Sequence, residues 1–271
     1  MNEFVQIDFL DLDAEQKDIL IAKLVVAGFE GFEETDAGLK AFVNKRDFSE
    51  TLVVEIADQL NVDFHQSIVE DTNWNKVWES NFDPVIVDDF VAIRADFHDP
   101  VKQVKHELIV TPKMSFGTGH HATTLMMIEQ MRQLDFSNKT VFDFGTGTGI
   151  LAILAEKMGA KKVVAIDNDD WSIQNAAENI YKNSCSAIEL QKAGSPPSGY
   201  SFDIILANIN KNVIIENLPL LKTRLSARGV LLLSGLLKED EDVIFRNSIE
   251  YSLQLKQTTV RDNWLCLRFS C

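Results

Sequence analysis

The sequence predicts an α/β protein whose main domain is a mostly parallel, doubly wound sheet, preceded by a small α+β domain. Residues 140–167 have the pattern of a buried strand (TVFDF), a glycine turn, a helix (ILAILAEKMGA) and a second strand. Strand and helix patterns continue to alternate after this stretch, which is typical of a parallel sheet with helices on both faces. Residues 1–66 carry a separate set of strand and helix patterns. The length allows either one large or two smaller domains.

The glycine turn has the features of a nucleoside-binding site. Gly145, Gly147 and Gly149 stand at alternate positions, so the backbone can turn sharply and leave amide groups uncovered beside a ligand. Asp167 ends the second strand, where a carboxylate can accept from two ribose hydroxyls. A dinucleotide fingerprint needs Gly or Ala where this chain has Ile150, which argues against a nicotinamide-dependent oxidoreductase.

Composition limits the partners of the protein. The net charge of −15 over 271 residues argues against direct binding of DNA or RNA, which requires Lys and Arg to neutralise phosphates, and favours a basic partner. The alternative explanation of this negative charge is an acidic, solvated surface without a basic partner. The N-terminus has no basic segment and no apolar run approaches the ~18 residues of a membrane span, so we expect a cytoplasmic protein with no membrane association. The three cysteines lack metal-ligand spacing, so no metal site is expected: Cys185, Cys266 and Cys271.

Residues 1–66 are predicted to form a ferredoxin-like domain. The order is strand, helix, strand, strand, helix, strand, with Ser49 as N-cap of the second helix and a hairpin across residues 36–38. Its many Asp and Glu residues and the lack of any catalytic cluster indicate binding or docking. We expect a linker at 67–82, where Trp74 and Trp78 share one helical face, and a main domain at 83–271.

A second wall of the nucleoside site is predicted in the segment TPKMSFGTGHHATT. Gly117 and Gly119 make a loop that can approach a ligand, and the following helix, beginning at Thr123 or Thr124, offers free amides and a hydroxyl. At the end of the fourth core strand stands Asn208, where an amide oxygen can orient an attacking amine. Its alternative role is the N-cap of the next helix. The chain is predicted to close with two antiparallel strands and a turn at Arg261 and Asp262.

These motifs resemble those of known methyltransferases. The pattern D-x-G-x-G-x-G-I-L from Asp143 is similar to motif I of class I S-adenosylmethionine-dependent methyltransferases. TPKMSFGTGHHATT resembles the signature P-G-M-A-F-G-T-G-T-H-P-T-T of the ribosomal protein L11 methyltransferase family, and DFGTGTGIL and ANIN follow in the same order. The chain departs from that family at Lys113, at Ala122 and in ANINKN, where the family has A-N-I-L-A-G.

The resemblance implies a ferredoxin-like substrate-recognition domain, a linker and a class I catalytic domain. It further implies S-adenosylmethionine as cofactor and methylation of lysine side chains and the N-terminal amine of a basic ribosomal protein. Asn208 would be catalytic and would also contact the cofactor. The other cofactor-binding residues implied are Phe116, Gly117, Thr118, Thr124, Gly145, Gly147 and Asp167. Alternative readings are a methyltransferase for another protein, a small amine or a nucleic acid base, and a noncatalytic cofactor-binding module.

Overall fold

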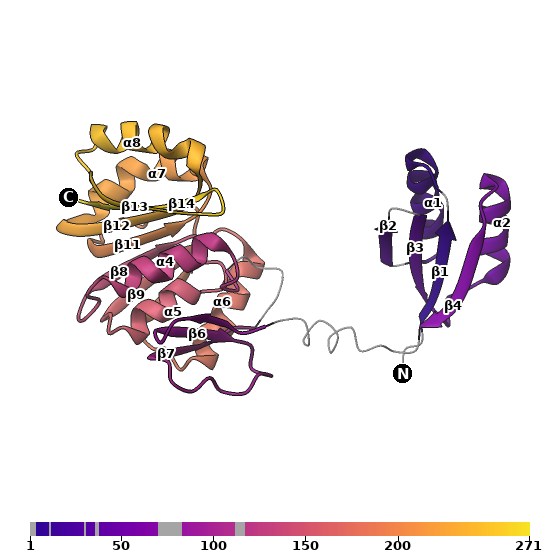
Figure 1. Ribbon diagram of the computed structural model, residues 1–271, viewed down its shortest axis with the longest axis horizontal. Helices are drawn as coiled ribbons and strands as arrows, with labels where there is room; N and C mark the ends of the chain where they lie inside the picture. Colours follow the sequence, from indigo (N-terminus) through magenta and orange to yellow (C-terminus); the bar gives the residue numbers. More distant parts are fainter. Residues whose placement is uncertain (1–3, 11, 30, 36–37, 70–82, 112–116) are drawn as a thin grey trace. The chain divides into compact units, whose positions relative to one another are not determined.

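The computed structural model describes residues 4–10, 12–29, 31–35, 38–69, 83–111 and 117–271. The chain divides into two compact units, residues 1–82 and 83–271 (Figure 1). Trp74 and Trp78 of the expected linker, and Phe116 of the expected cofactor loop, lie outside the described residues.

The N-terminal unit is a four-stranded antiparallel sheet with two helices. Its elements follow the predicted order: β1 (Phe4–Leu10), α1 (Ala14–Val26), β2 (Gly31–Thr35), β3 (Gly38–Asn44), α2 (Glu50–Leu60) and β4 (Phe64–Val69). The strand order β2-β3-β1-β4 is that of a ferredoxin-like split βαβ unit. The prediction of this fold is therefore confirmed.

Local sequence explains both helices of this unit. Asp13 caps α1, accepting from the Gln16 backbone N–H at 2.8 Å, while the Gln16 side chain accepts from the Asp13 N–H at 3.0 Å. Ser49 occupies the N-cap position of α2 as predicted, although its hydroxyl makes no capping bond. Alternate residues of β1 are buried beneath the helices, so one face of the sheet forms the core with, among others, Ile7, Phe9, Leu20, Leu24 and Val53.

The C-terminal unit contains a seven-stranded sheet in the order β10-β9-β8-β11-β12-β14-β13. The strands are β8 (Thr140–Phe144), β9 (Lys162–Asp167), β10 (Ile188–Lys192), β11 (Phe202–Asn208), β12 (Leu225–Leu237), β13 (Gln254–Arg261) and β14 (Trp264–Ser270). The strands from β10 to β12 pair in parallel, and β14 is antiparallel to both of its neighbours. The strand order reverses between β8 and β11, which is where a doubly wound sheet opens a crevice for ligands.

Helices cover both faces of this sheet. They are α4 (Ala122–Arg132), α5 (Ile150–Lys157), α6 (Asp170–Lys182), α7 (Lys211–Arg224) and α8 (Glu241–Glu250), the last preceded by the short 3₁₀ helix η1 (Lys238–Asp240). Met126, Ile153 and Leu154 of α4 and α5 belong to one buried cluster, whereas Ile214 and Ile244 of α7 and α8 belong to another, on the opposite face (Figure 1). This arrangement confirms the predicted α/β doubly wound fold.

Two predicted local boundaries were wrong by one or two residues. The hairpin between β13 and β14 turns at Asp262 and Asn263, both with positive φ (48° and 66°), rather than at Arg261 and Asp262. Such a pair of left-handed residues fits the twist of a two-residue hairpin, and Asp and Asn tolerate it best. Helix α4 begins at Ala122, one or two residues before the expected Thr123 or Thr124, because the imidazole Nδ1 of His121 caps it by accepting from the Thr123 N–H at 3.3 Å.

A small three-stranded sheet, β5 (Val85–Val87), β6 (Val91–Arg94) and β7 (His106–Ile109), precedes the main sheet. Arg94 and Glu107 face each other across the β6–β7 pair and form a bidentate ion pair with N–O distances of 2.9 and 3.1 Å. The Arg94 side chain is buried and also donates to the carbonyls of Ala95 and His98. These hydrogen bonds from Arg94 hold the pKa of Glu107 below its ordinary value of 4.5.

We expect Arg94→Met to lower the free energy of unfolding by about 2–3 kcal/mol, because it leaves the Glu107 carboxylate and two carbonyls without their donor. Since the Glu107 pKa is lowered in the folded state, the pair stabilises the fold above the ordinary glutamate pKa, and that contribution disappears as pH falls through the folded value. The difference in free energy of unfolding between wild type and variant, measured by urea unfolding, should therefore become smaller at acid pH. A difference that is constant from pH 7 to pH 3 would contradict the assignment.

Candidate active site

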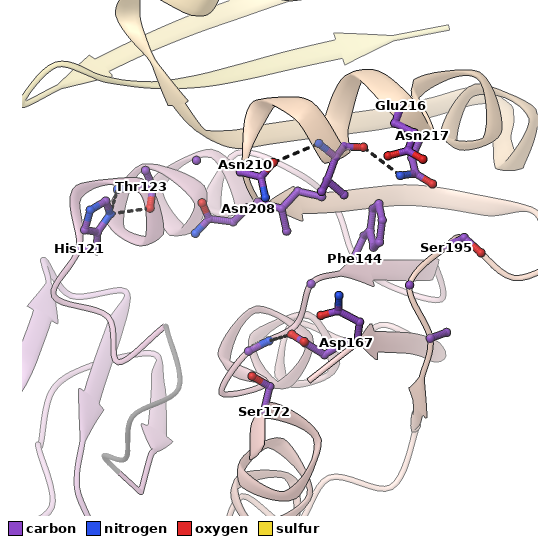
Figure 2. A pocket seen from close by; sticks show the side chains of 18 of the residues that line it. His121, Thr123, Phe144, Asp167, Ser172, Ser195, Asn208, Asn210, Glu216 and Asn217 are labelled. Carbon is purple, nitrogen blue, oxygen red and sulfur yellow. Dashed lines mark hydrogen bonds between the residues drawn. The ribbon is translucent and has the colours of Figure 1, made fainter. Parts of the chain in front are cut away.

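A cavity of about 640 Å³ opens at the carboxyl ends of the central strands (Figure 2). Its walls come from the turns after β8, β9, β10 and β11, from the first turns of α4, α6 and α7, and from Gly235 and Trp264. The remaining lining residues are His121, Thr123, Phe144, Gly145, Gly147, Asp167, Asn168, Ser172, Ala193, Gly194, Ser195, Asn208, Ile209, Asn210, Val213, Glu216 and Asn217. This is the position in which open α/β sheets bind ligands.

The glycine turn connects β8 to α5 at the cavity wall. Gly145, Gly147 and Gly149 all have positive φ (73°, 54° and 81°), a conformation that other residues rarely adopt. The N–H groups of Gly145 and Thr146 both donate to the Ile166 carbonyl at 2.9 Å, which fastens the turn to β9. A Cβ on Gly145 would overlap the Ile209 side chain. The turn therefore brings the ends of three strands close together and leaves no side chain over its backbone.

Asp167 is the last residue of β9 and lines the cavity. Its Oδ2 accepts from the Gly147 N–H at 2.9 Å and its Oδ1 from the Asp169 N–H at 3.1 Å. These bonds fix the carboxylate, and each oxygen has a further lone pair for a hydroxyl donor. A fixed carboxylate with spare acceptor capacity is suited to hold a ribose, as the sequence predicts.

Asp143 lies beneath the turn and is fully buried. Its Oδ2 accepts from the Thr146 hydroxyl at 2.6 Å. Burial raises the pKa of Asp143 to about 7, because the charged form loses its solvation, and the nearby negative charge of Asp167 acts in the same direction. The Thr146 bond and a backbone contact from Ala152 oppose that shift only in part. Asp143 is therefore a group whose charge changes near neutral pH at the base of the site.

Asn208 ends β11 and projects toward the cavity beside the turn (Figure 2). Its Oδ1 is buried and has no hydrogen-bond partner within the described part of the chain, while its Nδ2 lies 3.5 Å from the Thr124 hydroxyl. The alternative role as a helix N-cap is wrong, because Asn210 caps α7 by accepting from the Val213 N–H at 3.1 Å. A buried acceptor without a partner is costly, so this oxygen is placed to receive a donor from a ligand.

The expected second wall lies against the glycine turn. The Gly117 carbonyl accepts from the Thr148 hydroxyl at 2.6 Å, and Thr118 contacts His120 at 3.3 Å. Gly117 and Thr118 do not line the cavity, whereas Thr123 does, and Thr124 is buried behind Asn208. Of the predicted site residues, the structure therefore gathers Gly145, Gly147, Asp167 and Asn208 around one cavity, with Thr124 in contact with Asn208.

Several lining residues were missed by sequence reasoning. The His121 and Trp264 rings meet edge to face with centroids 4.8 Å apart, although the residues are far apart in the chain. Ala193, Gly194 and Ser195 follow β10, so the rule that ligands bind at the carboxyl ends of strands could have found them. Glu216 and Asn217 lie on α7, which carries no motif that points to a ligand.

The structure also bears on metals and membranes. Among the described residues, no three His, Cys, Asp or Glu side chains are grouped so that they could hold a metal ion. No helix in the described ranges is long and apolar enough to span a membrane.

Comparison with known proteins places the chain in a family. A sequence model of the family described as ribosomal protein L11 methyltransferase (PrmA) matches residues 8–271. The chain belongs to this family. A curated relative from Porphyromonas gingivalis, named ribosomal protein L11 methyltransferase, is 38% identical over 261 residues, covering 93% of this chain and 90% of the relative. One from Chlorobaculum tepidum with the same name is 36% identical, covering 94% and 92%.

Solved structures agree with this membership. The crystal structure of ribosomal protein L11 methylase from Lactobacillus delbrueckii subsp. bulgaricus matches with a TM-score of 0.65 and 30% identity, covering 70% of this chain and 98% of that one. A methyltransferase from Pyrococcus furiosus shares the fold at 19% identity, with a TM-score of 0.52, over 60% of this chain and 88% of that one. The chain is thus a class I methyltransferase, and its cofactor is S-adenosylmethionine. The bare glycine turn, the fixed Asp167 carboxylate and the unpartnered Asn208 oxygen fit that cofactor.

Gly235 provides a test of the close packing at this site. It has a φ of 80°, and a Cβ there would overlap the Ile209 backbone, next to Asn208. We expect Gly235→Ala to displace this segment, to lower the methyl transfer rate at least ~10-fold and to destabilise the fold by about 2–3 kcal/mol. Gly199→Ala is the matched control, because Gly199 has the same φ with no atom within 4 Å of the added Cβ. Equal effects of the two substitutions on rate and on thermal unfolding would refute the packing argument.

Proposed function

We propose that this enzyme transfers methyl groups from S-adenosylmethionine to amino groups of ribosomal protein L11, both lysine side chains and the N-terminal amine. The observation that carries the proposal is the Asn208 Oδ1, a buried acceptor without a partner in the described chain, on the cavity wall beside the glycine turn. The names of the relatives support the choice of substrate. When bound, the cofactor supplies a methyl group on a sulfonium, which a neutral nitrogen can attack.

The cofactor would lie across the glycine turn. Gly145 and Gly147, whose N–H groups already bond Ile166 and Asp167, would let the backbone approach its methionine part closely, and Asp167 would accept from its ribose hydroxyls. Thr124 would support this wall through Asn208, and Phe116, Gly117 and Thr118 would belong to the loop that closes the second wall. These roles follow from position and hydrogen-bonding capacity, and the affinity measurements below test them.

Asn208 would orient the incoming amine. An amide oxygen can accept an N–H of the substrate and so direct the nitrogen lone pair toward the methyl group. Removing the proton from a lysine of pKa ~10.4 at pH 7 costs roughly 4.6 kcal/mol, whereas an α-amine of pKa ~8 costs roughly 1.4 kcal/mol. Burial of the substrate amine favours its neutral form through loss of solvation, its proton passing to water before the amine is enclosed, and the Asn208 oxygen then orients the free amine.

The N-terminal unit would bind the basic substrate. Residues 1–66 contain most of its Asp and Glu side chains, and the whole chain has a net charge of −15. Such an excess of negative charge attracts a basic ribosomal protein and speeds its association at low salt. The boundary predicted at 66 falls inside β4, which ends at Val69. We therefore assign the N-terminal unit up to Val69 to substrate recognition, the residues from there to 82 to a linker and 83–271 to catalysis, acting on a cytoplasmic substrate.

The cofactor geometry is tested by Asp167→Ala. Loss of a charged acceptor for two hydroxyls should weaken the binding of S-adenosylhomocysteine by about 10- to 100-fold in calorimetric titration. Asp167→Asn retains one acceptor oxygen and should lie between wild type and the alanine variant. Circular dichroism should show that both variants are folded. Full affinity in the folded alanine variant would exclude this placement of the ribose.

The substrate is tested with labelled S-adenosylmethionine and ribosomes that lack the modification. The full chain should label one large-subunit protein, L11, whereas residues 83–271 should bind S-adenosylhomocysteine normally and label L11 poorly, because the acidic unit is missing. Labelling of another protein, of a small amine or of RNA would reject L11 as the substrate. Undiminished labelling by residues 83–271 would reject only the proposed role of the N-terminal unit and would leave L11 as the substrate.

A further inference from the structure

Three buried asparagines recur at every fourth position of α6 and at its end: Asn175, Asn179 and Asn183. This spacing places their side chains along one face of the helix. Buried amides retain their place in a helix when their polar atoms have partners. Asn179 and Asn183 both use their side chains to hold backbone groups of other segments, but the segments differ.

Asn179 joins the glycine turn to the end of β7. Its Oδ1 accepts from the Thr111 N–H at 2.8 Å, and its Nδ2 donates to the Thr148 carbonyl at 2.8 Å. Thr148 belongs to the glycine turn, and Thr111 follows β7. One fully buried side chain therefore spans the distance between the turn and the end of this strand.

Thr148 receives a second connection from the same segment. Its hydroxyl donates to the Gly117 carbonyl at 2.6 Å, and a Cβ on Gly117 would come within 2.9 Å of that hydroxyl oxygen. Thr148 is thus linked to the segment directly at Gly117 and through Asn179 at Thr111. Two hydrogen-bonded connections of this kind fix the position of Thr148, and with it the glycine turn, more rigidly than either alone.

Asn183 offers an internal comparison. Its Oδ1 accepts from the Ile109 N–H at 3.0 Å, and its Nδ2 donates to the Ile109 carbonyl at 2.6 Å. It is buried like Asn179, and its Nδ2 also donates to the Asn179 carbonyl of α6 at 2.8 Å, yet none of the three backbone groups that it bonds belongs to the glycine turn. The two residues differ chiefly in whether their bonds reach the turn.

We propose that Asn179 is a positioning residue for the cofactor: its amide holds the glycine turn in place by tying Thr148 to Thr111 at the end of β7. The inference rests on the proposed placement of S-adenosylmethionine at the glycine turn. Asn179 does not line the cavity and acts through Thr148 and Thr111. A displaced glycine turn weakens binding of a ligand that lies against Gly145 and Gly147, because preorganisation is lost.

The test compares Asn179→Leu with Asn183→Leu in the full-length enzyme. Both substitutions preserve side-chain size and deprive three polar groups of a hydrogen-bond partner: two backbone groups and the Asn175 Oδ1 for Asn179→Leu, and three backbone groups for Asn183→Leu. Both should therefore lower the melting temperature to a similar extent. Only Asn179→Leu should raise the Kd for S-adenosylhomocysteine and the KM for S-adenosylmethionine, by about tenfold, as expected for a loss near 1.4 kcal/mol. The KM for L11 should stay unchanged in both variants.

Asn179→Asp provides the second variant if the leucine variant does not fold. It retains an acceptor for Thr111 and loses the donor to Thr148, so it should also raise the KM for S-adenosylmethionine. Equal cofactor affinity in the Asn179 and Asn183 variants would overturn the proposal and leave Asn179 with a structural role. Failure of the proposed cofactor placement is distinguishable, since in that case Asp167→Ala would bind S-adenosylhomocysteine as tightly as wild type.

Discussion

The site depends on how closely three backbone segments approach each other at the glycine turn. Two amides of the turn share the Ile166 carbonyl, so the end of β8 is bound to the end of β9. Gly145 and Gly235 both lie against Ile209, and neither has room for a Cβ, so the turn after β11 is held between them. This packing places Asn208 beside the turn and Asp167 opposite the same space. The absence of side chains at Gly145 and Gly235 is therefore what allows these strand ends to approach each other.

The same packing determines the electrostatics of the site. Asp143 lies under the turn, away from solvent, and its pKa of about 7 reflects that burial. Asp167 lies at the cavity surface, where two backbone N–H groups stabilise its charge. The two carboxylates thus have different roles: one is a buried group bound to Thr146, and the other is a half-buried acceptor in the cavity. The Gly147 N–H joins the glycine turn above Asp143 to Asp167 at the end of the neighbouring strand.

The sequence predicted those parts of the molecule whose local conformation requires a recognisable pattern of residues. Alternating burial identified the strands of both units, and the glycine triplet and Asp167 marked the cavity, because backbone conformation and strand ends leave a local signature. The contact between His121 and Trp264 has no such signature, since it joins α4 to β14 through tertiary packing. The imidazole cap of α4 was missed because His is an uncommon capping residue and its role depends on the rotation of its ring. The hairpin at Asp262 and Asn263 was displaced by one residue, because only the paired register of β13 and β14 decides which residues turn.

The segment ANINKN shows how a departure from the family pattern is accommodated. Asn210 caps α7, and Lys211 forms an ion pair of 2.6 Å with Asp240, which also accepts from the Leu237 N–H at 2.9 Å. These contacts fix the start of α7 against the segment after β12, so the residues that depart from A-N-I-L-A-G stabilise the helix terminus. Asn208 and Ile209 precede the change, retain the family residues and keep their contacts with Thr124 and with the two glycines. The side chains proposed to hold the amine are thus those that the departure leaves in place, while Asn210 alters only the rim of the cavity.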